Sequence, residues 1–519
     1  MAKQRQAWGT RLGIIMAVAG SAIGLGNFLR FPVQAASNGG GAFMIPYFVS
    51  LFLLGIPLMW IEWTLGRYGG GFGHGTAPGI FHTMWEKNRF IKYFGVIGIF
   101  GPLIIFIYYT YIESWTLAYS FFAITGKYAG ATSEGSMRSF LSAFQGLEKN
   151  QFFSSMGLAY TFFIITFAAN LFVIYYGIKG GIEKLCNIAM PLLFFFGIAV
   201  MIRVLTLGAP DPARPTWNLA NGLGFLWNPD FQALKSAKVW LAAAGQIFFT
   251  LSVGIGVILT YASYLSKGDD VVLSGLSAVS TNELAEVVLG GSIIIPAAFI
   301  FFGPQQITTI AKSGAFNLGF VAMPLIFEKM LFGAVFACFW FLLLFLAGIT
   351  SSISLAQPAV AFMEDEFNIT RERAVSIFGV VSFILCQPAI FLLGRGVVNE
   401  LDFWGGTFCL VLFATVETIL FAWVFGMEKA WQEIHHGADM NVPKVYKFII
   451  KYITPLFLIV VLGSWIYQEG IPTFFMKGVP DADKPFVLGT RIFLVSIFAV
   501  LAVMVKIVWR NKKRGRAKA

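Results

Sequence analysis

Long apolar segments with few or no charged residues alternate with short polar stretches along the whole chain. A helix of about 20 apolar residues spans the hydrocarbon core of a bilayer, where an unpaired charge costs several kcal/mol. Twelve segments fit this requirement, at residues 12–36, 41–66, 93–125, 157–177, 185–206, 239–265, 271–302, 332–362, 374–393, 400–425, 450–468 and 486–509. The pattern therefore predicts an all-α integral membrane protein with twelve transmembrane helices.

Composition excludes the other broad classes of protein. Hydrophobic residues make up 57% of the 519 positions and charged residues 12%, about half of the roughly 25% usual in soluble domains. Too little polar surface remains for a soluble globular, disordered or coiled-coil protein. The net charge of +11 does not indicate nucleic-acid binding, because the basic residues lie between and beyond the apolar segments, where they orient a membrane protein.

An even number of spans puts both termini on one side of the membrane. Lys3, Arg5, Arg11 and the basic tail at 511–519 mark that side as cytoplasmic. We expect a multi-pass protein of a prokaryotic cytoplasmic membrane, with the lipid bilayer around it. The stretches at 126–156, 207–236 and 304–330 then face outward as loops long enough to form a lid.

Two of the twelve segments contain a matched interruption. The first reads Ser-Ala-Ile-Gly-Leu-Gly at 21–26, and the sixth reads Ser-Val-Gly-Ile-Gly at 252–256. Glycine is less favourable than alanine in a helix by about 1 kcal/mol, and lipid offers exposed backbone no hydrogen-bond partner. The glycines could simply allow close helix packing, but the pairing favours two broken helices that line a polar cavity.

The breaks begin the two halves of a pattern typical of transporters with inverted repeats and a site at the membrane midplane. We predict one membrane domain over 1–519, with a first repeat at 8–206 (helices 1–5) and a second at 237–426 (helices 6–10). Two additional helices follow at 445–510, and the basic tail occupies 511–519. Unwound carbonyls suit a cation, and half-helix N-termini suit an anion.

Several motifs carry a resemblance to a known family. They include RLGIIMAVAGSAIGLGNFLRFP from Arg11, GQIFFTLSVGIGVILTYASY, STNELAEVVLGGSI, LAGITSSISLAQPAVAFMEDE and LDFWGGTF. With these motifs the chain resembles the neurotransmitter:sodium symporter family, in the prokaryotic amino-acid transporter branch similar to the bacterial leucine transporter. The resemblance implies a symporter, not an enzyme, that imports a neutral, hydrophobic amino acid with two sodium ions by alternating access.

The resemblance implies two sodium sites made of uncharged oxygen donors. The first would use Ala22, Asn27, Thr250, Asn282 and an oxygen of the substrate carboxylate. The second would use Gly20, Ile23, Ala347, Thr350 and Ser351. Hydroxyls within a membrane helix often bond only to their own carbonyls, which is the alternative interpretation. If the substrate supplies the negative ligand, sodium and substrate favour each other's binding by one coupling energy.

The same resemblance implies a site for the substrate backbone. The carboxylate would meet amides around Leu25 and Gly26 and the Tyr109 hydroxyl, and the amino group would meet carbonyls near Ala22, Phe249 and Thr250 and the Ser351 hydroxyl. Monoamine carriers of the family have an acidic residue where this chain has Gly24, so an amino acid is favoured.

The side chain of the substrate would enter a pocket that is apolar apart from one hydroxyl. Its expected lining is Ile105, Phe249, Ser252, Ile255 and Leu355. A methylene more or less in such a pocket is worth about 1–3 kcal/mol, which does not rank the neutral amino acids.

Charged residues at the ends of the spans match the gates of the family. Arg30 and Asp402 would close the outer gate, often through water, above Tyr109 and Phe249. Arg5 and Asp365, with Trp8 and Tyr264, would close the inner gate. The alternative for the outer pair is that each charge reaches the membrane interface separately.

Intramembrane carboxylates are functional by default. Glu286 stands where chloride-dependent relatives have a small hydroxyl residue, so chloride independence is expected, with proton antiport through Glu286 as a further expectation. Glu62, Glu113 and Glu417 are expected to brace amides of the broken helices or to cap polar networks.

Two other functions stay open from the sequence. An amino-acid-gated channel would also use broken helices, and a non-transporting sensor could share the fold. A homodimer is left open as well.

Overall fold

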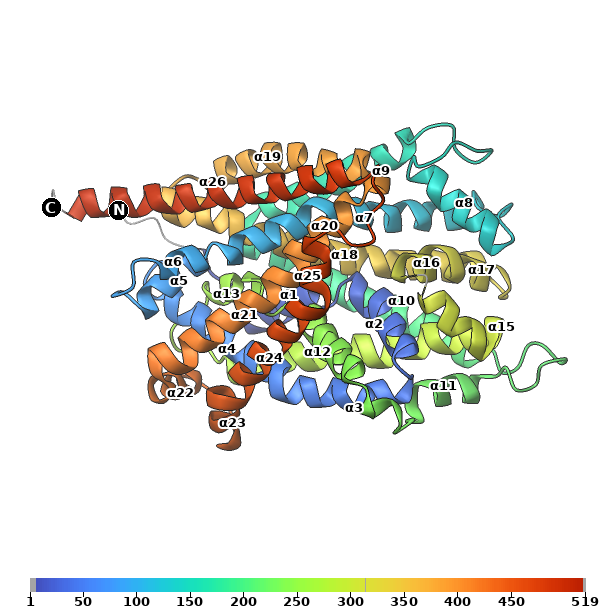
Figure 1. Cartoon of the computed structure of the whole chain (residues 1–519), viewed down its shortest axis with the longest axis horizontal. Coiled ribbons are helices and arrows are strands. Elements are labelled where there is room, and N and C mark those ends of the chain that lie inside the picture. The colour runs from blue at the N-terminus through green and yellow to red at the C-terminus, as the bar shows by residue number, and fades with distance from the viewer. Residues whose placement is uncertain (1–5, 313, 517–519) are drawn as a thin grey trace.

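The computed structural model describes residues 6–312 and 314–516, and its elements are helices that run roughly alongside one another (Figure 1). The elements that correspond to the predicted spans are α1 (Arg11–Ala22) with α2 (Leu25–Ser37); α3 (Gly41–Ser50) with α4 (Ile56–Gly70); α6 (Ile91–Phe94) with α7 (Ile97–Thr125); α9 (Gly157–Tyr175); α10 (Lys184–Leu205); α12 (Ala237–Leu251) with α13 (Val257–Ala262); α14 (Val272–Glu283) with α15 (Gly291–Lys312); α18 (Gly333–Phe367); α19 (Arg371–Phe391); α20 (Val397–Leu401) with α21 (Cys409–Ile419); α23 (Val445–Phe448), α24 (Thr454–Trp465) and α25 (Ile471–Phe474); and α26 (Lys484–Arg516).

Length and composition identify most of these elements as membrane spans. Within the described residues, ten helices are long and apolar enough to cross a bilayer, and α1 with α2, bent by 47° at their junction, makes an eleventh. The predicted sixth span is divided into α12 and α13, which are each too short to cross alone. The outer helices expose large apolar side chains such as Phe172, Ile384 and Val495, as a lipid-facing surface requires.

The broken helices occupy the middle of the bundle. The first half, α1, packs against α10, α14 and α18, while α2 packs against α12 and α15. The other broken helix lies beside it, with α12 against α3 and α13 against α4. Around them, α18 packs along α7 and α10, and Figure 1 shows α1, α12 and α13 enclosed by these longer helices. Both interruptions are therefore surrounded by protein and not by lipid.

Five-residue to seven-residue π-helical turns interrupt several spans. They include η1 (Leu51–Gly55) between α3 and α4, η2 (Ile178–Glu183) before α10, η4 (Leu284–Gly290) between α14 and α15, and η7 (Asp402–Phe408) between α20 and α21. Such turns are frequent at functional sites. Here η4 carries Glu286 and η7 begins at Asp402, two of the predicted site residues.

The predicted outer loops contain further helices. The first includes α8 (Glu134–Phe144), and the second includes α11 (Leu219–Trp227). The expectation of a loop over 304–330 is wrong in part, because α15 continues to Lys312 and is followed by α16 (Ala315–Asn317), η5 (Leu318–Ala322) and α17 (Met323–Glu328). Gly303, with φ of +77°, interrupts the helical backbone before Pro304, so α15 consists of two helical pieces that meet at a kink there.

Candidate functional site

The first helix breaks between Ala22 and Leu25. The Ile23 amide still donates to the Ala19 carbonyl at 2.7 Å, whereas Gly24 is extended and its amide donates to Asn27 Oδ1 at 2.9 Å. The last carbonyls of α1 and the first amides of α2 are therefore free of regular helical bonds. The C-terminal end of α1, which carries the negative end of its dipole, and the N-terminal end of α2, which carries the positive end, therefore meet at the break.

The second break lies between Leu251 and Val257. Ser252 is in the left-handed region with φ of 53°, and Gly254 and Gly256 have φ of 78° and 81°. A left-handed non-glycine residue is strained and persists only where its surroundings hold it. The Ser252 hydroxyl donates to the Ser21 carbonyl at 2.8 Å, so this residue ties the two breaks together.

A carboxylate from outside the broken helices supports the second break. Glu62 on α4 accepts the Gly254 amide, and it accepts the Leu259 amide at 3.3 Å. Its side chain is completely buried, and Glu417 on α21 lies beside it. Glu62 thus replaces the helical acceptors that these amides have lost, which is the bracing role predicted for it from the sequence.

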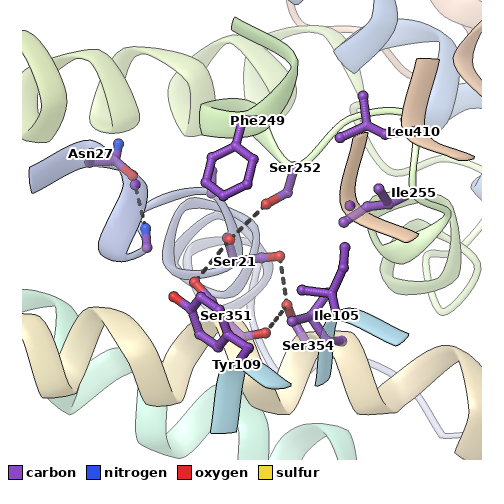
Figure 2. A pocket seen from close by; sticks show the side chains of 15 residues that line it. Ser21, Asn27, Ile105, Tyr109, Phe249, Ser252, Ile255, Ser351, Ser354 and Leu410 are labelled. Carbon is purple, nitrogen blue, oxygen red and sulfur yellow. Dashed lines mark hydrogen bonds between the residues drawn. The ribbon is translucent and has the colours of Figure 1, made fainter. Parts of the chain in front are cut away.

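A cavity of about 50 Å³ lies between the two breaks (Figure 2). It is lined by Ser21, Ala22, Gly24, Gly26, Asn27, Ile105, Tyr109, Phe249, Ser252, Ile255, Ser351, Ser354, Leu355, Gly406 and Leu410. All of the predicted substrate-binding residues are in this lining except Leu25 and Thr250. The Leu25 amide instead donates to the Tyr109 hydroxyl at 3.1 Å, and Thr250 contacts the polar group described below.

Four lining residues were not predicted as site residues from the sequence, namely Ser21, Ser354, Gly406 and Leu410. Ser354 follows the predicted residue Ser351 by three positions on α18, so helical periodicity alone could have placed both on one face. Gly406 and Leu410 come from the region of η7 and α21, and no local signal relates them to the broken helices.

The side chains predicted for the first sodium site lie in mutual contact. The Asn27 amide donates to Thr250 Oγ1 at 3.0 Å and to Asn282 Oδ1 at 2.8 Å, and the Asn282 amide donates to Thr250 Oγ1 at 3.1 Å. All three are buried. Their oxygens are uncharged hard donors, and Ala22, the fourth predicted ligand, lines the cavity together with Asn27.

The residues predicted for the second sodium site lie where α1 meets α18. A Cβ atom added to Gly20 would lie 3.1 Å from Thr350 Cβ, so the two helices approach closely there. The Ser351 hydroxyl reaches the Gly20 carbonyl at 3.4 Å, and the Thr350 hydroxyl donates to Leu346 and Ala347 carbonyls at 2.9 and 3.2 Å. Ile23 is buried in the adjacent break. The Thr350 hydroxyl therefore bonds within its own helix, as the alternative interpretation of these hydroxyls expects. The Ser351 hydroxyl instead bonds across to α1.

Glu286 has a complete set of buried donors. It accepts the Gln246 side-chain amide at 2.9 Å, the Tyr47 hydroxyl at 3.1 Å and the Thr250 hydroxyl. A second acid, Glu283, accepts from the same Tyr47 hydroxyl at 2.9 Å. Sequence reasoning missed Glu283, although its spacing of three residues from Glu286 places both on one helical face.

The outer gate residues are close to the cavity but are not joined as an ion pair. The Arg30 guanidinium lies 4.3 Å from the centre of the Phe249 ring, and Asp402 accepts the Tyr108 hydroxyl at 2.6 Å. No salt bridge links Arg30 to Asp402 among the described residues. Phe249 lies so close to Gly26 that a Cβ atom there would lie 2.5 Å from the ring, so this ring packs directly on Gly26 while the Arg30 guanidinium lies over it.

The inner gate residues lie on the opposite side of the breaks. The Trp8 indole donates to the Tyr261 carbonyl at 3.0 Å, and Gln357 donates to the Tyr264 hydroxyl at 2.9 Å. Asp365 is near the end of α18, and Arg5 lies outside the described residues. The structure adds an unpredicted ion-pair group, in which Arg11 bonds to Asp270 at 2.6 Å and to Asp439.

Glu113 takes the second of the two roles expected for the intramembrane carboxylates, which is to cap a polar network. It accepts from the Asn170 side chain at 3.2 and 3.3 Å, and Ser352 in turn donates to Asn170 Oδ1 at 2.5 Å. These bonds join α7, α9 and α18. Glu113 therefore caps a polar network among unbroken helices.

Comparisons with known proteins agree on one family. A sequence model of the sodium:neurotransmitter symporter family matches residues 5–140 and 127–511. An uncharacterised sodium-dependent transporter of Methanocaldococcus jannaschii is 31% identical over 469 residues, which cover 88% of this chain and 90% of that protein. Sodium-dependent nutrient amino acid transporter 1 of Drosophila yakuba is 24% identical over 510 residues, covering 88% and 77%. The crystal structure of MhsT in complex with L-phenylalanine matches with a TM-score of 0.75 and 31% identity, over 89% of this chain and 100% of that chain.

Fold and site together define a multi-pass α-helical membrane protein with an oxygen-lined cavity between two broken helices. The chain belongs to the sodium:neurotransmitter symporter family, a family of sodium-dependent transporters. The expected family and the expected all-α membrane fold are confirmed. The boundaries of the two repeats stay a prediction.

Proposed function

We propose that the protein is a symporter that imports a neutral amino acid together with two sodium ions. One observation carries this proposal. Asn27 lines the cavity at the amide end of α2, and its side chain is hydrogen-bonded to the uncharged oxygens of Thr250 and Asn282 directly behind it. A sodium ion there gains a negative ligand only when a substrate carboxylate occupies the cavity, so ion and substrate bind cooperatively.

The proposed substrate class follows from the lack of a side chain at Gly24. A Cβ atom at this position would lie 2.9 Å from Ser351 Oγ and 3.0 Å from the Tyr109 hydroxyl, so no side chain fits there as the structure stands. The cavity thus has no acidic group of its own to pair with an amine. The carboxylate of an amino acid fits this arrangement better than a substrate that lacks one, and the bound L-phenylalanine of MhsT is in accord with an amino acid.

The proposed binding roles are those implied by the family resemblance. The substrate carboxylate meets the amides of Leu25 and Gly26 and the Tyr109 hydroxyl, and its amino group lies near Ala22 and Ser351. Gly20, Ile23, Ala347, Thr350 and Ser351 hold the second sodium ion. Ile105, Phe249, Ile255 and Leu355 surround most of the substrate side chain.

Alternating access completes the proposal. Arg30, Phe249 and Asp402 close the outer side, and Trp8, Tyr264 and Asp365, with Arg5, close the inner side. Each sodium ion that enters gains about 2.3 kcal/mol per 100 mV of membrane potential, which is enough to concentrate the substrate. Both termini face the cytoplasm in this arrangement, and the membrane is that of a prokaryotic cell.

In the proposed function, the Glu286 carboxylate takes the place of a chloride ion and also binds the proton that is carried outward. This carboxylate already occupies the centre of the donors Tyr47, Gln246 and Thr250, so a chloride ion has no place there. During the return of the empty carrier, a proton on Glu286 would replace the positive charge that sodium has left.

Uptake into proteoliposomes tests the proposed function. The purified full-length chain is given each of the twenty amino acids under an inward sodium gradient, with sodium replaced by potassium or chloride replaced by gluconate in turn. We expect neutral amino acids to accumulate only when sodium is present, and to the same extent in chloride and in gluconate. Equal uptake without sodium would refute symport, binding without uptake would identify a sensor, and non-saturable flux would identify a channel.

A further inference from the structure

One wall of the cavity carries three serine hydroxyls where sequence reasoning expects one. Ser21 on α1 and Ser354 on α18 lie with their Oγ atoms 2.7 Å apart, and Ser252 lies next to them at the second break. All three line the cavity, and Figure 2 shows Ser21 between the other two. Ser21 and Ser354 are 3% and 1% exposed, so bulk water does not compete for their bonds.

The bonds of these hydroxyls account for all of their protons. Ser354 donates to the Ser351 carbonyl at 2.6 Å, so the proton between Ser354 and Ser21 comes from Ser21. Ser252 donates to the Ser21 carbonyl at 2.8 Å. A hydroxyl has one proton to donate and two lone pairs that accept. Each oxygen therefore keeps accepting capacity toward the cavity, and none has a proton left to offer.

Another part of the lining is apolar. It consists of Ile105, Ile255, Leu355 and Leu410, which are all buried. A substrate side chain in this cavity therefore meets both hydrocarbon and hydrogen-bond acceptors. The cavity has a volume of about 50 Å³. This is a few times the roughly 10–15 Å³ that one water molecule needs on the same measure, so the cavity favours a substrate with a small side chain.

We propose that Ser21 and Ser354 determine specificity, by selecting a small neutral amino acid whose side chain donates a hydrogen bond, with threonine as the best fit. The methyl group of threonine contacts the apolar wall and its hydroxyl donates to the serine pair. This inference rests on the proposed function and narrows its substrate class.

Threonine and valine provide the test, because they have nearly the same shape and differ in one hydroxyl. Inhibition of labelled alanine uptake is measured with each amino acid in proteoliposomes that contain the full-length chain. One neutral hydrogen bond is worth about 0.5–1.5 kcal/mol, so threonine should bind about 3- to 10-fold more tightly than valine. Equal inhibition or a preference for valine would overturn the inference, whereas the proposed function would stand as long as sodium-dependent uptake is seen.

Two variants assign the preference to the serine pair. Ser21→Ala and Ser354→Ala should each reduce the threonine-to-valine affinity ratio to about one. Ser382→Ala is the matched control, because Ser382 is equally buried, donates to its own helix at 2.6 Å and does not line the cavity. An unchanged ratio in both cavity variants would overturn the assignment. Uptake of no amino acid by the wild-type chain would instead refute the proposed function.

Discussion

The hydroxyl of Thr250 donates a hydrogen bond to the carboxylate of Glu286, and its oxygen accepts one from the Asn27 amide. One side chain thus joins the proposed first sodium site to the intramembrane acid. A change of charge on Glu286 must therefore alter the position or the electron density of a sodium ligand. Under the proposed function, this contact links sodium binding to proton binding on Glu286.

Removal of the Glu286 side chain should create a need for chloride. In Glu286→Ser, Gln246 and Thr250 lose this acceptor, Tyr47 keeps only its bond to Glu283, and a space is left between these donors. An anion that enters it recovers bonds whose loss costs about 1–3 kcal/mol for each buried group. Uptake by the variant should therefore be low in gluconate and restored by chloride, while wild-type uptake is the same in both.

Glu286→Gln separates the effect of charge from the effect of space. Glutamine fills the same volume without a negative charge, so chloride has no room and should not rescue uptake. Rescue of both variants, or of neither, would contradict the role given to this position.

The Thr350 hydroxyl should contribute to sodium affinity. Thr350→Val keeps the shape of the side chain but removes the hydroxyl proposed as a ligand of the second sodium ion. Because a contact to a charged group is worth about 1.5–3 kcal/mol, the sodium concentration for half-maximal substrate binding should rise at least about tenfold. Thr415→Val is the control, since Thr415 is also buried and bonds to its own helix at 2.7 Å on α21. Equal effects of the two changes would count against the second sodium site.

A side chain at position 24 should interfere with substrate binding. Gly24 has φ of −117°, which alanine adopts readily, so the only penalty of Gly24→Ala is the short contacts to Ser351 and Tyr109. Overpacking of this kind costs about 1–3 kcal/mol, and substrate affinity in a sodium-saturated binding assay should fall about 5- to 150-fold. Gly463→Ala, on α24 with no atom within 4 Å of the new methyl group, should bind substrate like the wild type. Normal affinity of Gly24→Ala would show that the substrate lies elsewhere.

Glu62 should stabilise the break of the sixth helix. Glu62→Leu leaves the Gly254 and Leu259 amides buried without an acceptor, at a cost of about 1–3 kcal/mol each. Glu62→Gln keeps one acceptor oxygen and should lose less. Thermal unfolding in detergent should therefore rank the wild type above Glu62→Gln and Glu62→Leu lowest. A melting temperature for Glu62→Leu equal to that of the wild type would refute the bracing role.

Particular residues show how far the sequence reaches. Gly24, Gly254 and Gly256 predict the helix breaks because glycine within an apolar run is locally unfavourable, and the breaks lie where expected. For the outer gate, the sequence predicts Arg30 opposite Asp402, often joined through water, but it does not predict that the Arg30 guanidinium lies over the Phe249 ring or that Asp402 accepts the Tyr108 hydroxyl. Partners of this kind depend on rotamers and on the closeness of helices that lie far apart in the chain.

The sequence by itself determined the membrane class, the helical spans and the two breaks, because hydropathy and glycine placement act over short stretches of backbone. Only the tertiary structure decided that Ser354 faces Ser21, that Glu283 shares Tyr47 with Glu286, and that Arg11 joins Asp270 and Asp439. Those contacts link residues on different helices or depend on a π-helical turn that changes the helical register, and hydrophobic periodicity carries no information about either.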